Sequence, residues 1–80
     1  MNENVLICAL RYAIKMADSA ETVTDYIAEE LPKLSDKCIE MMLKDIEKAR
    51  LNIPYRFGLC ELDWNCLKEQ LEEEMGKRYG

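Results

Sequence analysis

The sequence predicts an all-α protein: a compact bundle of three to four short helices that forms one domain over residues 1–80. Three observations favour this class. Apolar residues recur at helical spacing, capping residues and prolines divide the chain, and the 80 residues include only three glycines and two prolines, with 49% hydrophobic and 34% charged residues. A domain this short buries only about 60% of the surface that its unfolded chain exposes, so self-association is a common source of extra stability.

The first helix is predicted over residues 4–17 and is apolar on almost every side. A buried strand would have a similar composition, but the length of the segment and its alanine, leucine and methionine content favour a helix. A helix without a polar face needs burial all round, which a few further short helices cannot supply. We therefore expect a homo-oligomer that assembles through this helix.

The second helix is predicted over residues 19–31. Asp18 is expected to act as its N-cap, with Glu21 three positions later, and Pro32 ends the segment because the residue before a proline avoids helical geometry. Val23 and Ile27 supply its apolar face. The pattern leaves open whether this helix is a kinked continuation of the first.

The third helix, over residues 35–51, has the clearest signals. Ser35 is expected to be the N-cap, and Leu34 and Ile39 lie at the positions of a hydrophobic staple. Its buried stripe contains Met42 and Ile46.

The last helix is predicted over residues 63–78, with a second staple formed by Leu62 and Leu67 around Asp63. Lys77 would lie favourably at its carboxyl end if the helix passes Gly76. The preceding residues 52–62 read as one long loop that is rich in large side chains. Such a loop either folds back over the core or presents a binding surface.

Composition excludes several functional classes. The net charge of −5 disfavours direct nucleic-acid binding, and the absence of histidine and of any Cys-x-x-Cys pair argues against structural zinc. Without a leader pattern or a long apolar run, the chain is expected in the cytoplasm and not in a membrane. Cys8 and Cys38 then read as small buried hydrophobes, and a bridge between Cys60 and Cys66 stays open.

The residues predict a protein that is not an enzyme, with no catalytic residue, metal or cofactor. The serine–histidine and cysteine–histidine nucleophile pairs need histidine, and Ser35 is better explained as a helix cap. Neighbouring carboxylates such as Glu72 and Glu73 lie where any solvated helix face would place them. No glycine-rich phosphate loop accompanies them.

The candidate ligand-binding residues are Arg11, Tyr12 and Lys15 on the first helix. The two cations lie one turn apart in an apolar surround. They could pair with acids of the second helix, such as Asp25 or Glu29, or they could mark the one solvated strip of the first helix. They could instead form a concave anion pocket, since arginine suits phosphate and tyrosine can stack on a base, or they could contact another protein directly.

The start of the chain resembles a family of short, mostly uncharacterised phage and prophage proteins that begin roughly I-C-A-[FL]-R-Y-[AC]-[IL]-G-R-x-T-Y. The residues that carry the resemblance are 7–14, with looser similarity in "DYI" at 25–27, "KDIEKA" at 44–49 and "DW" at 63–64. The chain departs from the motif where Lys15 replaces its glycine. The resemblance implies a phage-encoded accessory protein in the cytoplasm of an infected bacterial host, and such proteins often act against host defence.

Two functional hypotheses follow. In the first, a small homo-oligomer binds and sequesters a nucleotide-type host immune signal at Arg11, Tyr12 and Lys15. In the alternative, the protein resembles an anti-CRISPR inhibitor and occupies the nucleic-acid groove of a host defence nuclease with four acidic residues of the last helix, Glu69, Glu72, Glu73 and Glu74. A small structural or regulatory phage component is a third possibility.

Overall fold

The computed structural model describes residues 2–80, and helices make up most of them. In chain order, the elements are α1 (Glu3–Met16), α2 (Ala20–Glu30), the 3-10 turn η1 (Leu31–Lys33), α3 (Asp36–Asn52), α4 (Pro54–Leu59) and α5 (Glu61–Tyr79). No strand occurs among residues 2–80. The all-α prediction is confirmed, with a fifth helix that was not expected.

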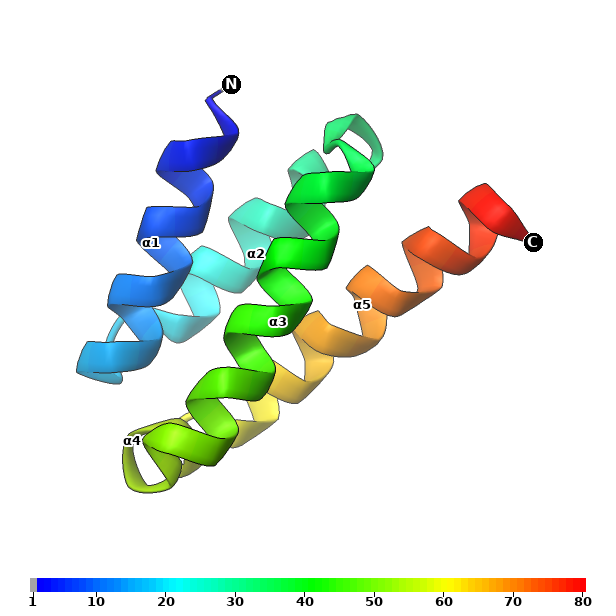
Figure 1. Cartoon of the computed structure of the whole chain (residues 1–80). Coiled ribbons are helices and arrows are strands. Elements are labelled where there is room, and N and C mark those ends of the chain that lie inside the picture. Colours follow the sequence, from blue (N-terminus) through cyan, green and yellow to red (C-terminus); the bar gives the residue numbers. More distant parts are fainter. Residues whose placement is uncertain (1) are drawn as a thin grey trace.

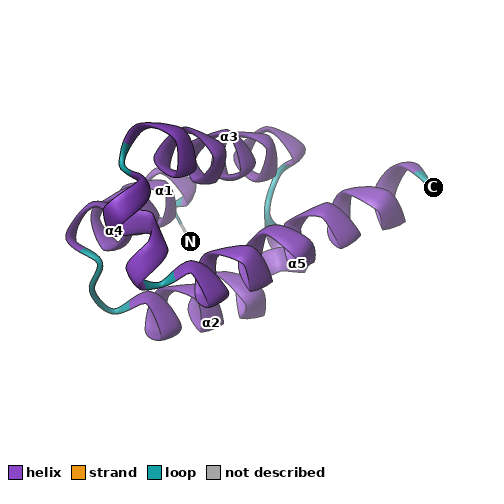
Figure 2. Cartoon of the chain, turned by 90° about the horizontal axis from the view of Figure 1, so that it is seen from below, coloured by secondary structure: helices purple, strands orange, loops and turns teal. Residues whose placement is uncertain are grey.

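The four longer helices surround one core in two layers. α1 packs against α2 and α3, and α5 packs against the same two helices, so that α1 and α5 lie on one diagonal and α2 and α3 on the other (Figure 1). Seen from below, α1 and α3 form one layer and α2 and α5 the other (Figure 2). α4 closes one end of the bundle against α1, α3 and α5.

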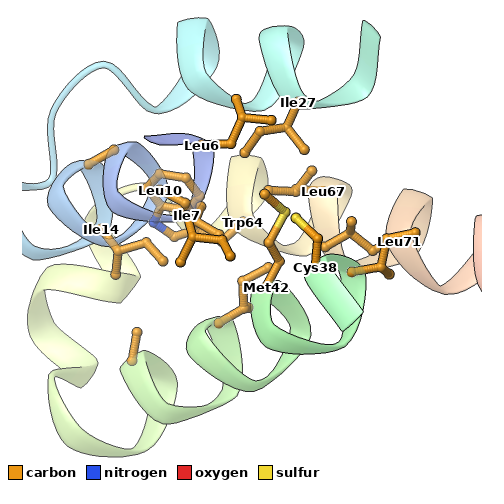
Figure 3. Close-up of a cluster of buried hydrophobic side chains, with 14 of the residues drawn as sticks. Leu6, Ile7, Leu10, Ile14, Ile27, Cys38, Met42, Trp64, Leu67 and Leu71 are labelled. Atoms are coloured by element: carbon orange, nitrogen blue, oxygen red, sulfur yellow. The ribbon is translucent and has the colours of Figure 1, made fainter. Parts of the chain in front are cut away.

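The centre of the core is a single tryptophan. Trp64 is fully buried, and Figure 3 shows side chains from α1, α2, α3 and α5 gathered around it. Its largest fully buried companions come from all four long helices: Leu10, Ile27, Ile39, Met42, Ile46, Leu67 and Leu71. Burying one such side chain contributes roughly 1.5–3 kcal/mol, so this cluster is the main source of stability.

A tight turn separates α1 from α2, so the two helices are not continuous. Ala17 ends α1 in the left-handed region, with φ 53° and ψ 46°. The backbone N–H groups of Ala17 and Asp18 donate to the carbonyls of Ile14 and Ala13, which is the Schellman arrangement. The predicted capping role of Asp18 is wrong, because Ser19 precedes α2 and makes no side-chain capping bond.

The predicted start of α3 is confirmed. The hydroxyl of Ser35 accepts a hydrogen bond from the backbone N–H of Cys38, and both staple residues, Leu34 and Ile39, are buried. Glu3 of α1 reinforces this corner, because its two carboxylate oxygens accept from the Ser35 amide and hydroxyl at 2.7 Å each. These bonds lower the pKa of Glu3 and fasten the start of α1 to the start of α3.

The carboxyl end of α5 is held at the same corner of the bundle, where α1 and α3 begin. α5 continues through Gly76 to Tyr79, and Arg78 donates to Asp36 at 2.8 Å, to Glu74 at 3.0 Å and to the carbonyl of Leu31 at 3.2 Å. Hydrogen bonds from the Tyr79 hydroxyl and from Arg78 lower the pKa of Asp36. The last turn of α5 is thus connected to η1 and α3.

Residues 52–62 are not the predicted loop. Pro54 begins α4, where its missing N–H costs no hydrogen bond, and Phe57 turns inward and is buried. Tyr55 and Leu59 remain exposed. The predicted staple of the last helix is also wrong, because α5 starts earlier, at Glu61, and leaves Leu62 86% exposed.

α1 is less completely covered than a uniformly apolar helix would require. Its inward face, Leu6, Ile7, Leu10, Ala13 and Ile14, is buried, whereas Val5, Tyr12 and Met16 are exposed on the opposite side. Assembly through this helix stays a prediction. Within residues 2–80, no helix is long and apolar enough to cross a membrane.

All four cysteines are free thiols. Cys38 is buried as predicted, and burial raises the pKa of its thiol. Cys8, in contrast, is exposed on α1 and not buried as predicted. Cys60 and Cys66 do not form a bridge with each other.

Candidate binding groove between α1 and α3

Arg11 lies at the edge of α1 that faces α3. Its Nε donates to the Asp45 carboxylate at 2.8 Å, and this hydrogen bond, with the charge of Asp45, raises the pKa of the guanidinium. The Arg11 partner therefore comes from the third helix. The predicted pairing with Asp25 or Glu29 of the second helix is wrong.

The pair borders an open groove of about 410 Å³ between α1, the second half of α3 and the start of α4. Its polar lining consists of Arg11, Asp45, Lys48 and Asn52, and its apolar lining consists of Ile14, Ala49 and Ile53. The volume lies in the range of about 300–1,000 Å³ that is typical of small-molecule sites.

The groove has the groups that a small anion needs. Asp45 occupies the Nε edge of Arg11, while the two terminal nitrogens of that guanidinium make no hydrogen bond within residues 2–80. Those nitrogens and the ammonium of Lys48 are donors for phosphate oxygens, and the Asn52 amide can both donate and accept. The Arg11 side chain is 53% exposed, whereas that of Asp45 is 11% exposed, so the cation is the accessible member of the pair.

Tyr12 and Lys15 do not line this groove. One residue along a helix is a rotation of about 100°, so Tyr12 points away from α3 and is 64% exposed on the outer side of α1. Lys15 is exposed one turn beyond Arg11, in the last turn of α1, where a cation favours the helix dipole. Of the three predicted ligand residues, only Arg11 therefore lines the groove.

The predicted acidic surface lies on α5. Glu69, Glu72 and Glu73 are exposed on its outer face together with Leu62. Glu74 turns inward instead and accepts a hydrogen bond from Arg78, with only 16% of its side chain exposed. Three of the four predicted acids are thus available to a partner.

A second groove, of about 290 Å³, lies between α1 and α2 and is almost wholly apolar. Its lining includes Val5, Leu6, Ala9, Val23 and Ile27. It has no cation or carboxylate in its lining, so it suits an apolar side chain better than an anion.

Sequence reasoning missed Asp45, Lys48 and Asn52 as groove residues. Their spacing of three and four places them on one face of α3, a pattern that the sequence contains. That pattern could not reveal which face meets Arg11, because the pair joins residues 34 positions apart.

Within the part of the chain that the structure describes, no group of three or more histidine, cysteine or acidic side chains is placed to hold a metal ion. Comparisons with protein families, curated proteins and solved structures found no significant match to this chain.

Proposed function

We propose that this protein acts by binding and not by catalysis, as a phage-encoded accessory protein that sequesters a nucleotide-type host immune signal. The observation that carries the proposal is the groove in which Arg11 and Lys48 lie beside an apolar surface. The phage origin rests on the sequence resemblance of residues 7–14. The proposed protein is a small homo-oligomer associated through α1, located in the cytoplasm of the infected host.

In this proposal Arg11 and Lys48 hold the phosphate groups, and the base lies on Ile14 and Ile53. The carboxylate of Asp45 opposes a phosphate, but it also fixes the guanidinium in place and can accept a hydrogen bond from a ribose hydroxyl or a base amino group. Tyr12 and Lys15 do not line the groove, so this proposal gives them no contact with the ligand.

Native mass spectrometry of the protein with cyclic oligonucleotides and ADP-ribose derivatives tests this proposal. We expect one of these compounds to add its mass in a fixed ratio, Arg11→Ala to abolish the adduct, and Lys48→Ala to weaken it. Asp45→Asn removes the opposing charge and is expected to strengthen binding. Lys44→Ala is the matched control, since Lys44 is an exposed lysine of α3 outside the groove lining. Absence of any adduct, or equal adducts in all variants, would contradict the groove assignment.

The alternative is that the protein inhibits a host defence nuclease through α5. It is favoured by the exposed face on which Leu62 accompanies Glu69, Glu72 and Glu73, since an apolar anchor beside acidic residues suits a protein groove built for nucleic acid. Replacing these three glutamates by lysine separates the hypotheses. If that variant no longer inhibits the nuclease while Arg11→Ala inhibits it fully, the result would support the inhibitor hypothesis and not ligand binding in the groove.

A further inference from the structure

The groove of about 290 Å³ between α1 and α2 has an apolar floor and apolar sides. Leu6 and Ile27 are buried at its floor, and Val23 lies beside them. Val5, on α1, is 60% exposed, and Tyr26, on α2, is 43% exposed. We call this hollow the α1–α2 groove. A hollow flanked by exposed apolar side chains is typical of an interaction site.

A row of acidic residues follows the edge of the α1–α2 groove on α2. Thr22 and Tyr26 line the groove on this side. Asp25 and Glu29 each follow one of these residues by three positions, so they lie in the next row on the helix surface. The row begins at Glu21, one turn before Asp25. All three acids are exposed, so the groove has an acidic wall on α2.

The charges of this acidic row are not compensated within the bundle. α2 contains no lysine or arginine. Within residues 2–80, the side chains of Glu21, Asp25 and Glu29 make no hydrogen bond or ion pair. Their carboxylates are therefore available to a cationic partner.

The opposite wall, on α1, carries no charge. Val5 and Ala9 line the groove on this side, and the residues three positions after them are Cys8 and Tyr12, both exposed. The two cations of α1 lie farther around the helix, on the side where Arg11 bonds to α3. The groove thus lies between an uncharged wall and an acidic wall.

We propose that the α1–α2 groove binds a cationic amphipathic helix of another protein. α1 and α2 lie side by side and run in roughly opposite directions (Figure 1), and the furrow between two such helices accepts the apolar face of a third. Apolar side chains of the partner enter the groove between the two walls. Lysine or arginine residues on one flank of the partner helix lie beside Asp25 and Glu29.

The charge of the α2 wall decides which class of partner fits. An anionic membrane surface or a nucleic acid would be repelled by Asp25 and Glu29, and so would a helix with an acidic flank. A helix with a basic flank gains from both parts of the site. The apolar groove supplies the contact area, and the acidic row supplies the selectivity.

Fluorescence anisotropy with a labelled synthetic peptide tests this proposal. The probe has about 15 residues, enough to form a helix when bound, with leucines at helical spacing on one face and lysines along one flank. We expect saturable binding, with one peptide for each chain by light scattering. A peptide with glutamate in place of each lysine should bind at least about tenfold more weakly, and so should a peptide with alanine in place of each leucine.

Charge reversal on the protein locates the site. Asp25→Lys combined with Glu29→Lys should weaken binding of the basic peptide by about tenfold or more, because like charges then face each other. Glu69→Lys combined with Glu73→Lys is the matched control. These two glutamates are also exposed and one turn apart, but they lie on α5, so the same change in net charge should leave binding within about twofold of the parent.

A block in the groove tests the apolar part of the site. Thr22 is exposed within the lining, so Thr22→Arg should retain the fold, obstruct the groove and prevent binding. Asn65→Arg, at an exposed position of α5, is the control and should bind like the parent. Arg11→Ala should also bind like the parent, because Arg11 lines the other groove. Circular dichroism of each variant checks that the fold is retained.

Four outcomes would overturn the inference. The first is no saturable binding of the basic peptide, and the second is an equal loss in the Glu69→Lys, Glu73→Lys variant, which would indicate unspecific attraction. The third is unchanged binding by Thr22→Arg. The fourth is an oligomer that excludes the peptide, which would assign the groove to a second copy. Ligand binding at Arg11 is measured separately by the adduct mass, so failure of this site and failure of the proposed function are distinguishable.

Discussion

Ala17 ends α1 in a backbone conformation that costs an L-amino acid with a side chain roughly 1–2 kcal/mol. Glycine adopts it freely and is the usual residue at this position of a Schellman turn. Ala17→Gly is therefore expected to raise the free energy of unfolding by about 1 kcal/mol, measured by urea titration. Ala28→Gly, within α2, is the matched control and should lower it by about 1 kcal/mol. A loss at both positions would mean that Ala17 is not strained.

Single residues also show what local sequence cannot convey. Ser35 was correctly predicted as an N-cap because its signal lies within a few residues of it. The hydrogen bonds that Ser35 donates to Glu3 and that Arg11 donates to Asp45 join positions more than 30 residues apart, so only the packed bundle defines them. Of the residues that line the candidate groove, the sequence analysis predicted only Arg11.

α4 is the element that the sequence analysis did not predict. Its six residues lack a side-chain cap and contain both Pro54 and Gly58, which normally indicate a loop. Packing against α1, α3 and α5 stabilises it instead, through the buried ring of Phe57. Short helices that depend on tertiary contacts in this way have weak sequence signals.

Removal of the Phe57 ring tests that dependence. Phe57→Ala is expected to lower the free energy of unfolding by about 3–5 kcal/mol, the usual cost of deleting a buried aromatic side chain. Tyr55→Ala, in the same helix but 77% exposed, should change it by no more than about 0.5 kcal/mol. Thermal melts followed by circular dichroism compare the two. Similar melts for both variants would contradict the buried position of Phe57.

For the whole molecule, the fold class and the four longer helices were predictable because periodicity and caps are repeated along the chain. Their pairing was not, since nothing in the periodicity indicates that α1 packs beside α2 and α3 and opposite α5. The exposed strip of α1 illustrates the same point. Its composition alone suggested complete burial, whereas the bundle covers only one side of it.

Acid should weaken the whole bundle at the corner where α1, α3 and α5 are fastened. The pKa values of Glu3 and Asp36 are lowered in the folded state, so both carboxylates contribute stability that is fully present above their ordinary pKa values, about 4, and is lost as the pH falls through the lower folded values.

We expect Glu3→Gln to be less stable than the parent at neutral pH and to lose less stability on acidification, as measured by urea titrations over a pH series. Glu21→Gln is the control, because the Glu21 carboxylate has no hydrogen-bond partner within residues 2–80 and lies outside that corner. A parallel pH dependence in the parent and in Glu3→Gln would show that Glu3 has no part in the acid response.

The position of Trp64 gives the protein a built-in optical probe. It is the only tryptophan in the chain, it is fully buried, and its indole Nε1 has no hydrogen-bond partner within residues 2–80. An indole in such a dry, apolar setting emits at short wavelength and is shielded from quenchers dissolved in water. Its fluorescence should change when any long helix around it is lost, and it should stay constant during events confined to the surface. Steady emission during ligand or partner binding would therefore mean that the core has not moved.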